Sequence, residues 1–583
     1  MSRTARNNTN QERKVPASPP PPRDRSLTIP AVALACLVSA CGPQGRASAP
    51  PLEKSAPAPA GAAAALTRAE SAYADLRALR DRISVSSSAG LREAPDGIPL
   101  ATLARRADSL RATLEPRLGA IDSVPLGSED RRALAVMRRV LDSGLGPVSD
   151  SLSLLAADTT PPDCMYDPRV LAASGGAGAL RARAYACYGW AGRRLRFEGR
   201  PLSRFTASQE QSPERRRKMF LALQPLWRSM DGAGGSGSPY RLLLGLEPRG
   251  REPPAAASAR ALGIEPDSLE RWLVRILETW RASTPDRLID PWDWEYVAGR
   301  ANRVLGRRIP RERLDSLDEQ VFRALGADPA GLGVHYDLAP RDGKTPVAFT
   351  DFGRRARRIG EAWAPAEPWV FATYETGDLT NLNELLHETG HAVHIAAIHT
   401  RPAFLDWPDS DPFSEALGDF VALDVYEPGW QYRWLGDSVP LADGLRARYA
   451  GIVMDVAWAL FEARLLRDPA LDPNQVWTAI TRNYLRIRPH PELSWWAMRG
   501  QLVDSPGYMM NYAAGAIVSA AIRARTRELH GPFATGDSTW YGWVAPRLYR
   551  WGLERSSRQV ITDFLGGPVT PAPILQDMRR MHR

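Results

Sequence analysis

The pentapeptide His387-Glu388-Thr389-Gly390-His391 constrains this chain more than any other stretch. On an α-helix, residues four positions apart share one face, so both histidines can bind the same metal ion. Glu388 directly follows the first histidine and can accept a proton from a water molecule at that metal. The pattern therefore predicts a helix that carries a zinc site together with its general base.

The sequence around the pentapeptide favours a buried helix. Apolar residues recur at helical spacing on both sides of it: Leu382, Leu385, Leu386, Val393, Ala396 and Ala397. Thr380 or Asn381 is expected to cap its N-terminus. The chain has only 8 histidines, and four lie within this segment: His387, His391, His394 and His399. Two chance histidines on an ordinary helix are the alternative, which this clustering disfavours.

A catalytic zinc needs a third protein ligand and keeps one position open. Metzincins place a third histidine ten residues after the first, but that position here is Ala397. Glu415 is the candidate, since a loop and a returning helix fit between His391 and this residue. Asp419 lies one turn further along and can accept the second ring N–H of a zinc histidine. An exposed carboxylate at a helix start is the alternative for Glu415.

These segments carry a resemblance to known families. His-Glu-x-Gly-His followed by Glu-Ala-x-Gly-Asp resembles the gluzincin metallopeptidases related to angiotensin-converting enzyme (the M2 family). Other segments resemble the thimet oligopeptidase and oligoendopeptidase F group (the M3 family): 291–296, 336–344 and 388–394. The similar stretch runs from about Trp292 to Tyr512.

The resemblance implies a mainly α-helical, two-lobed metallopeptidase with a deep substrate channel and a small β-element beside the zinc helix. It implies one Zn2+ per chain at the floor of that channel, with short peptides as substrates. It also implies a tyrosine, usually with a nearby histidine, that stabilises the oxyanion of the reaction.

Tyr508 and Tyr512 are the candidates for that tyrosine. They lie one helical turn apart, so both could face the metal and donate a hydrogen bond to the oxyanion. Two aromatic core residues on a helix are the alternative. The chain departs from the family pattern here, because the nearest preceding histidine is His490. Tyr512 is the favoured donor, since it lies deeper in the expected helix.

The segment from Pro368 to Tyr374 precedes the zinc helix and is rich in β-branched and aromatic residues, which predicts a short strand. As an edge strand it would hold a peptide substrate by main-chain hydrogen bonds, with Ala372 as the contact. A buried connecting strand is the alternative.

The N-terminal sequence predicts export. Arg23 and Arg25 precede an apolar run from Leu27 to Ala40, which suits a signal peptide and is too short for a membrane span. The run ends at Cys41 in Val-Ser-Ala-Cys, which resembles a bacterial lipobox whose cysteine is lipidated. We therefore expect a lipid anchor in the bacterial cell envelope, facing the periplasm or the exterior. An ordinary cleaved signal or a chance apolar run is the alternative.

Four regions are expected: a lipoprotein signal peptide (1–40), an Ala/Pro-rich tether (41–65), a helical N-terminal region (66–335) and a zinc metallopeptidase catalytic region (336–583). Helical periodicity predicts helices at Leu269–Ala282, Arg311–Leu325, Leu445–Leu466 and Gln475–Ile487. Beyond the signal and the anchor, the remaining cysteines are Cys164 and Cys187. In an oxidising compartment they could form a disulfide, or remain buried thiols.

The composition is typical of a globular protein, with 44% hydrophobic and 24% charged residues. The formal net charge of +9 is small for 583 residues, and the sequence contains no phosphate loop, so nucleic-acid binding is not expected. The sequence favours a monomeric zinc peptidase, of oligopeptidase or peptidyl-dipeptidase type, acting on short peptides outside the cytoplasm. The alternatives are a carboxypeptidase or aminopeptidase on a related zinc fold, or a non-catalytic zinc-binding helical lipoprotein.

Overall fold

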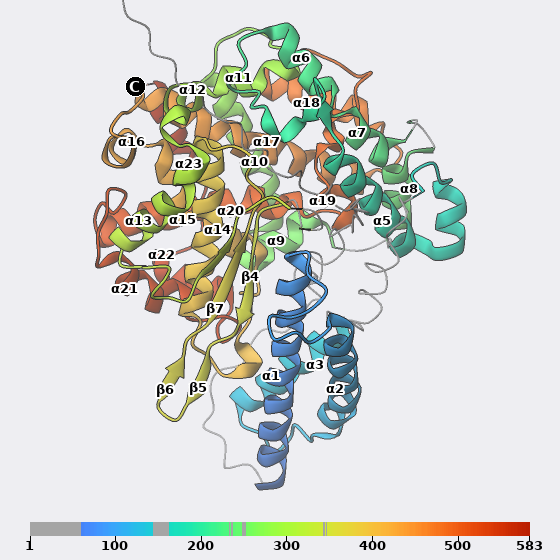
Figure 1. Cartoon of the computed structure of the whole chain (residues 1–583), viewed down its shortest axis with the longest axis vertical. Helices are drawn as coiled ribbons and strands as arrows, with labels where there is room; N and C mark the ends of the chain where they lie inside the picture. Colours follow the sequence, from blue (N-terminus) through green and yellow to red (C-terminus); the bar gives the residue numbers. More distant parts are fainter. Residues whose placement is uncertain are drawn as a thin grey trace, which may run out of the picture.

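The computed structural model describes residues 60–143, 163–232, 234, 237–247, 252–341, 344 and 347–582. The expected signal peptide, Cys41 and most of the tether lie outside these residues. Within them the chain is mainly α-helical with a few small sheets, as predicted (Figure 1). None of the described helices combines the length and the apolar character that crossing a membrane requires.

Three N-terminal helices share an apolar core of their own: α1 (Ala60–Ser88), α2 (Leu100–Ala120) and α3 (Ser128–Ser143). Helix α1 begins within the expected tether, because the alanine run at 62–65 has a high helix propensity. Leu76 and Leu103 lie in this core, and Phe404 from the C-terminal half of the chain packs into it. The three helices therefore dock directly onto the rest of the molecule.

The next helices are mostly short, and several begin with proline in the first turn, where its missing N–H leaves no helical hydrogen bond unmade. They are α5 (Pro168–Arg193), α6 (Pro213–Leu221), α7 (Gln224–Asp231), α8 (Pro239–Leu246), α9 (Pro254–Leu262), α10 (Pro266–Ala282), α11 (Trp294–Ala298), α12 (Arg300–Leu305) and α13 (Leu314–Ala324).

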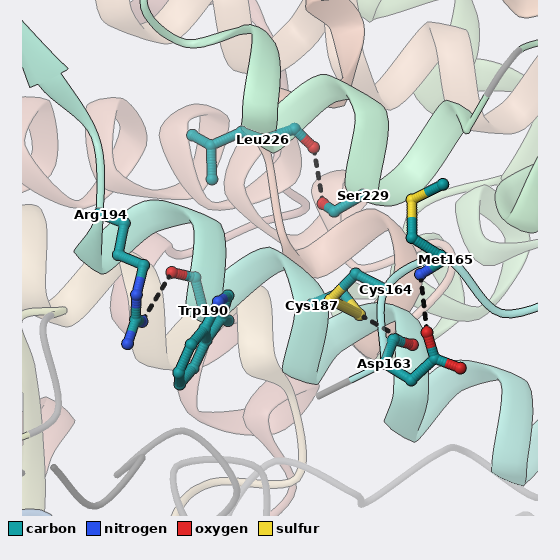
Figure 2. Close-up of a disulfide and its surroundings, with 8 residues drawn as sticks. All are labelled: Asp163, Cys164, Met165, Cys187, Trp190, Arg194, Leu226 and Ser229. Atoms are coloured by element: carbon teal, nitrogen blue, oxygen red, sulfur yellow. Dashed lines mark hydrogen bonds between the residues drawn. A yellow bond between two sulfur atoms is a disulfide. The ribbon is translucent and has the colours of Figure 1, made fainter. Parts of the chain in front are cut away.

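A disulfide joins Cys164, in the segment before α5, to Cys187 within that helix (Figure 2). The backbone N–H of Met165 donates to the Asp163 carboxylate at 3.0 Å, which shapes the turn next to the bond. Of the two states left open for these cysteines, the structure has the disulfide, which ties the segment entering α5 to the helix itself.

The C-terminal half begins with the expected zinc helix and is almost entirely helical. They are α14 (Leu379–Ala397), α15 (Asp411–Ala422), α16 (Pro428–Leu435), α17 (Leu441–Arg467), α18 (Pro473–Leu485), α19 (Gln501–Asp504), α20 (Met509–Leu529), α21 (Trp540–Val544), α22 (Ser557–Leu565) and α23 (Ala572–Arg579). Helix α15 packs against both α14 and α20, and α20 packs against α17. The four helices predicted from periodicity are confirmed as α10, α13, α17 and α18, with ends shifted by a few residues.

A three-stranded sheet lies beside α14, in the order β3 (His335–Asp337), β7 (Glu367–Phe371), β4 (Phe349–Arg354). Strand β7 is parallel to β3 and antiparallel to β4. Two small hairpins complete the strands: β1 (Arg196–Phe197) with β2 (Arg200–Pro201), and β5 (Arg357–Ile359) with β6 (Ala362–Ala364). In Figure 1 the β5–β6 hairpin extends toward the end of the molecule occupied by α1–α3.

The strand before the zinc helix is central, so the expectation of a substrate-binding edge strand at Ala372 is wrong. Ala372 is fully buried, and its N–H donates to the Asp337 carbonyl at 3.0 Å. Its carbonyl accepts a hydrogen bond from the Lys344 ammonium. The pairing with β3 comes from a segment more than thirty residues upstream, which local composition does not reveal. The outer strand on the other side of β7 is β4.

Candidate metal centre

The N-terminus of α14 is fixed by a buried polar cap. The Asp378 carboxylate accepts the Asn381 N–H at 2.8 Å, and the Asn302 amide donates to the same carboxylate at 3.0 Å. The Asn302 side-chain oxygen accepts the Leu379 N–H at 2.9 Å. The cap is therefore Asp378 and not Thr380 or Asn381, because the helix starts earlier than its apolar pattern suggested. These bonds satisfy helix N–H groups that would otherwise lack partners.

Three side chains from α14 and α15 converge at one point. His387 Nε2 lies 3.1 Å from His391 Nε2 and 3.5 Å from a Glu415 carboxylate oxygen. The three ligand atoms all lie within 4.8 Å of one another. Two ligands at about 2.0–2.1 Å from a tetrahedral zinc lie roughly 3.3 Å apart. The donor set and its spacing therefore fit Zn2+.

Two glycines allow α14 and α15 to approach this closely. A Cβ atom on Gly418 would lie 2.8 Å from His391 Nε2 and 2.9 Å from His387 Cε1. A Cβ atom on Gly390 would lie 2.6 Å from the Gly418 carbonyl oxygen. Such contacts are shorter than packed atoms tolerate, so a side chain at either position would move the helices or the ligands apart.

The charges around the ligands favour a cation. His387 Nδ1 lies 2.8 Å from the Asp419 carboxylate, an orientation that leaves Nε2 for the metal. Burial acts to lower the pKa of His387, but Asp419 and Glu415 outweigh it and raise that pKa well above its usual value. Burial holds the pKa of His391 well below its usual value, so this imidazole is neutral. The field that attracts a proton to His387 also attracts a divalent metal ion.

Glu388 is buried on the same helix, one residue after the first histidine. Burial raises the pKa of its carboxyl to about 7, against the opposing effects of His387 and of the Thr350 hydroxyl. A carboxyl with a pKa near neutrality suits a general base at neutral pH, because it both accepts and releases a proton readily.

Both candidate tyrosines lie near the third ligand. The Tyr508 hydroxyl donates to Glu415 Oε1 at 3.1 Å, and its ring meets that of Tyr512 edge-on with 5.4 Å between centroids. Burial, followed by the charge of Glu415, raises the pKa of both phenols, so both carry their proton. Tyr508 is the residue just before α20, and Tyr512 lies in its first turn.

The turn before α20 is held by Glu462 of α17, which sequence reasoning missed. Its carboxyl accepts the N–H groups of Gly507 at 2.8 Å and Met509 at 3.0 Å. Burial raises its pKa to about 8. Gly507 has φ +93°, and a Cβ atom there would lie 2.3 Å from Pro254 Cγ. The orientation of the Tyr508 side chain thus depends on contacts of this turn with Glu462 and Pro254, which come from two distant segments.

His490 has its partners elsewhere in the fold. Its ring nitrogens lie 2.7 Å from Glu492 and 3.4 Å from Asp290, and the ring packs on Trp292. The structure brings Tyr508 and Tyr512 to the candidate metal ligands, whereas His490 lies with Asp290, Trp292 and Glu492.

Two charged residues near the centre were also missed by sequence reasoning. Glu384 lies one turn before His387 on α14, and part of the residue is exposed to solvent. Partial loss of water around its carboxyl raises the pKa of that group. Arg499 forms an ion pair with Asp455 and acts electrostatically on both Glu384 and Tyr512. The helical spacing of Glu384 from His387 could have pointed to Glu384. Arg499 follows a short 3₁₀ helix, Trp495–Met498, whose sequence does not relate it to the site.

Solved structures with a similar fold include metallocarboxypeptidases. An M32 carboxypeptidase from Deinococcus radiodurans R1 matches with a TM-score of 0.52 and 16% identity, covering 89% of this chain and 98% of that chain. A Pyrococcus furiosus carboxypeptidase matches with a TM-score of 0.51 and 15% identity, over 89% and 99% of the two chains. Metallocarboxypeptidase 1 from Trypanosoma cruzi matches with a TM-score of 0.50 and 14% identity, over 89% and 99%.

No protein family model and no curated protein sequence matches the chain. At identities this low, the structural similarity establishes the fold: this chain has the helical architecture of those metallopeptidases over most of its length.

Proposed function

We propose that this protein is a zinc-dependent peptidase that hydrolyses short peptides. The observation that carries the proposal is the convergence of His387, His391 and Glu415, with the buried carboxyl of Glu388 beside them. The fold shared with metallocarboxypeptidases over nearly their whole length supports it. The intact general base argues against a purely structural metal site.

Different residues of the chain act at different steps of the hydrolysis. Zinc, when bound, supplies a Lewis acid for the attacking water and the scissile carbonyl. Glu388 accepts a proton from the water as its oxygen attacks the carbonyl carbon. The same carboxyl then gives that proton to the leaving nitrogen as the C–N bond breaks, which restores its starting state. Tyr508 or Tyr512 donates a hydrogen bond to the oxyanion that develops in between.

Three modes of cleavage are candidates. The sequence motifs favour an oligopeptidase or peptidyl-dipeptidase, whereas the fold similarity to metallocarboxypeptidases favours removal of single C-terminal residues. We place the enzyme outside the cytoplasm, anchored in the bacterial envelope through Cys41. The Cys164–Cys187 disulfide supports this location, because disulfides persist in oxidising compartments.

Peptide products distinguish these modes. Zinc-loaded protein would be incubated with matched short peptides that have free, amidated or acetylated ends, and the products read by mass spectrometry. A carboxypeptidase releases single C-terminal residues and spares amidated peptides, a peptidyl-dipeptidase releases dipeptides, and an oligopeptidase cuts internal bonds.

Glu388→Gln is the control, because it keeps the shape of the side chain and removes the base. We expect it to retain zinc and to lose activity by about 10² or more. Absence of hydrolysis by the zinc-loaded parent, or parental turnover in the control, would refute the proposed function.

A further inference from the structure

Thr350 of β4 contacts Glu388 at two points. Its Oγ1 lies 2.9 Å from Glu388 Oε2 and 2.8 Å from the Glu388 carbonyl oxygen. The Thr350 side chain is almost completely buried, with 8% of the residue exposed. A threonine hydroxyl has one proton and donates it to one acceptor at a time, or shares it between two. Because both acceptors belong to one residue, the hydroxyl links the carboxylate of Glu388 to its own helix backbone.

Strand β4 is held on its opposite face by helix α1. Side chains alternate along a strand, so Thr350 faces α14 while Asp351 faces away from it. The Asp351 carboxylate accepts a hydrogen bond from Ser84 of α1. Arg355, just after β4, forms an ion pair with Asp81 of α1 at 2.6 Å. Strand β4 therefore lies between α14 and α1, and α1 restricts its movement away from α14.

We infer that Thr350 is a positioning residue for the general base: its hydroxyl holds the Glu388 carboxylate in the rotamer that reaches the attacking water. The inference deepens the proposed function and rests on it. Glu388 Oε2 accepts the Thr350 hydroxyl, which leaves Oε1 to take up the water's proton. Restricting the carboxylate in this way keeps one oxygen aimed at the substrate throughout the cycle.

The side-chain chemistry of position 350 supplies a matched set of variants. Valine has the shape of threonine without the hydroxyl, so Thr350→Val keeps the packing and removes the donor. Serine keeps the donor, so Thr350→Ser should retain most of the activity. Since Glu388 acts on the water and not on substrate binding, Thr350→Val should lower kcat about 10- to 100-fold and leave KM nearly unchanged.

The test compares kcat, KM, zinc content and melting temperature in the parent and the variants. Thr481→Val is the matched control: Thr481 is a buried threonine that donates to the Trp477 carbonyl in α18, and its variant should keep the parental kcat. Combining Thr350→Val with Glu388→Gln should add little to the loss from Glu388→Gln alone, because the positioned carboxylate is already gone.

The inference is supported if Thr350→Val loses kcat at full zinc occupancy and Thr350→Ser restores it. It is overturned if Thr350→Val turns over peptide at the parental rate, or if its defect is fully additive with Glu388→Gln. A zinc-loaded parent that hydrolyses no peptide would instead refute the proposed function, and the inference with it.

Discussion

At the scale of single residues, the phenol groups of Tyr508 and Tyr512 have different surroundings. Tyr508 donates to Glu415, so its hydroxyl also orients the carboxylate of the candidate third ligand. The ring of Tyr512 meets that of Tyr508, and its phenol lies in the electrostatic field of Arg499. One phenol therefore supports a ligand, and the other is available for the oxyanion.

We expect Tyr512→Phe to lower kcat, with KM and zinc content close to the parental values, because an oxyanion hydrogen bond exists only along the reaction path. The loss should amount to about 2–4 kcal/mol of transition-state stabilisation. Tyr508→Phe should instead weaken zinc binding, measured by competition with a chromogenic chelator. If both variants keep parental kcat and zinc affinity, neither phenol has the proposed role.

Residues within one helix were predictable from the helical period, and Glu415 and the two tyrosines were predictable from the third-ligand requirement and the family resemblance. Other residues that the fold brings to the site from distant segments were not. The helical period alone places His387, Glu388 and His391 together, and the same reasoning relates Asp419 to Glu415. Thr350, Glu462 and Asn302 act through partners 38, 45 and 76–77 residues away. Each is a single polar residue in an ordinary pattern, so nothing local marks it.

At the scale of elements, the contact between α14 and α15 sets the geometry of the metal centre. We expect Gly418→Ala to reduce zinc affinity strongly, since its Cβ would lie within 3 Å of both histidine rings. Zinc titration followed by fluorescence or calorimetry measures this. Gly451→Ala in α17 is the control, because a Cβ there meets nothing within 4 Å. Equal zinc affinity in the two variants would contradict the close-packing argument.

The sequence pattern predicted strand β7 but not its position within the sheet. The β-branched and aromatic residues before α14 correctly indicated a strand, β7, because composition reports local conformation. Its neighbours depend on which distant segments reach it, and β3 and β4 occupy both of its edges. The choice between edge and central strand therefore needed the three-dimensional arrangement.

At the scale of the whole molecule, buried ion pairs join α17 to α23 near the C-terminus. Arg448 lies 3.1 Å from the Asp577 carboxylate, and the Tyr449 hydroxyl donates to it at 2.6 Å. Burial acts to raise the pKa of Asp577, but Arg448, Tyr449 and Arg580 outweigh it and lower that pKa to about 2.

Because the folded-state pKa of Asp577 is below its unfolded value of about 3.9, the carboxylate stabilises the fold above that pH. This stabilisation, about 2 kcal/mol, should disappear as the pH falls from about 4 to about 2. The difference in unfolding free energy between the parent and Asp577→Asn, measured in urea, should shrink over that range. The exposed Asp563→Asn is the control, with a small difference at every pH. A difference for Asp577→Asn that does not change with pH would refute this prediction.

The proposed lipid anchor at Cys41 would attach the whole molecule to the envelope. We expect Cys41→Ser to abolish labelling by a radioactive or clickable fatty acid and to shift the protein from the membrane to the soluble fraction, because that thiol is the proposed attachment point. Cys164→Ser should leave the labelling unchanged. Continued labelling and membrane fractionation of Cys41→Ser would exclude the lipid anchor at this position.

The zinc content of the purified protein tests the central claim most directly. Elemental analysis of the parent should give about one zinc per chain, since three protein ligands converge at a single site. His387→Ala and Glu415→Ala, each dialysed in parallel with the parent, should lose most of this zinc while remaining folded by circular dichroism. Full zinc occupancy in either folded variant, or no zinc uptake by the parent, would contradict the metal centre on which the proposed peptidase depends.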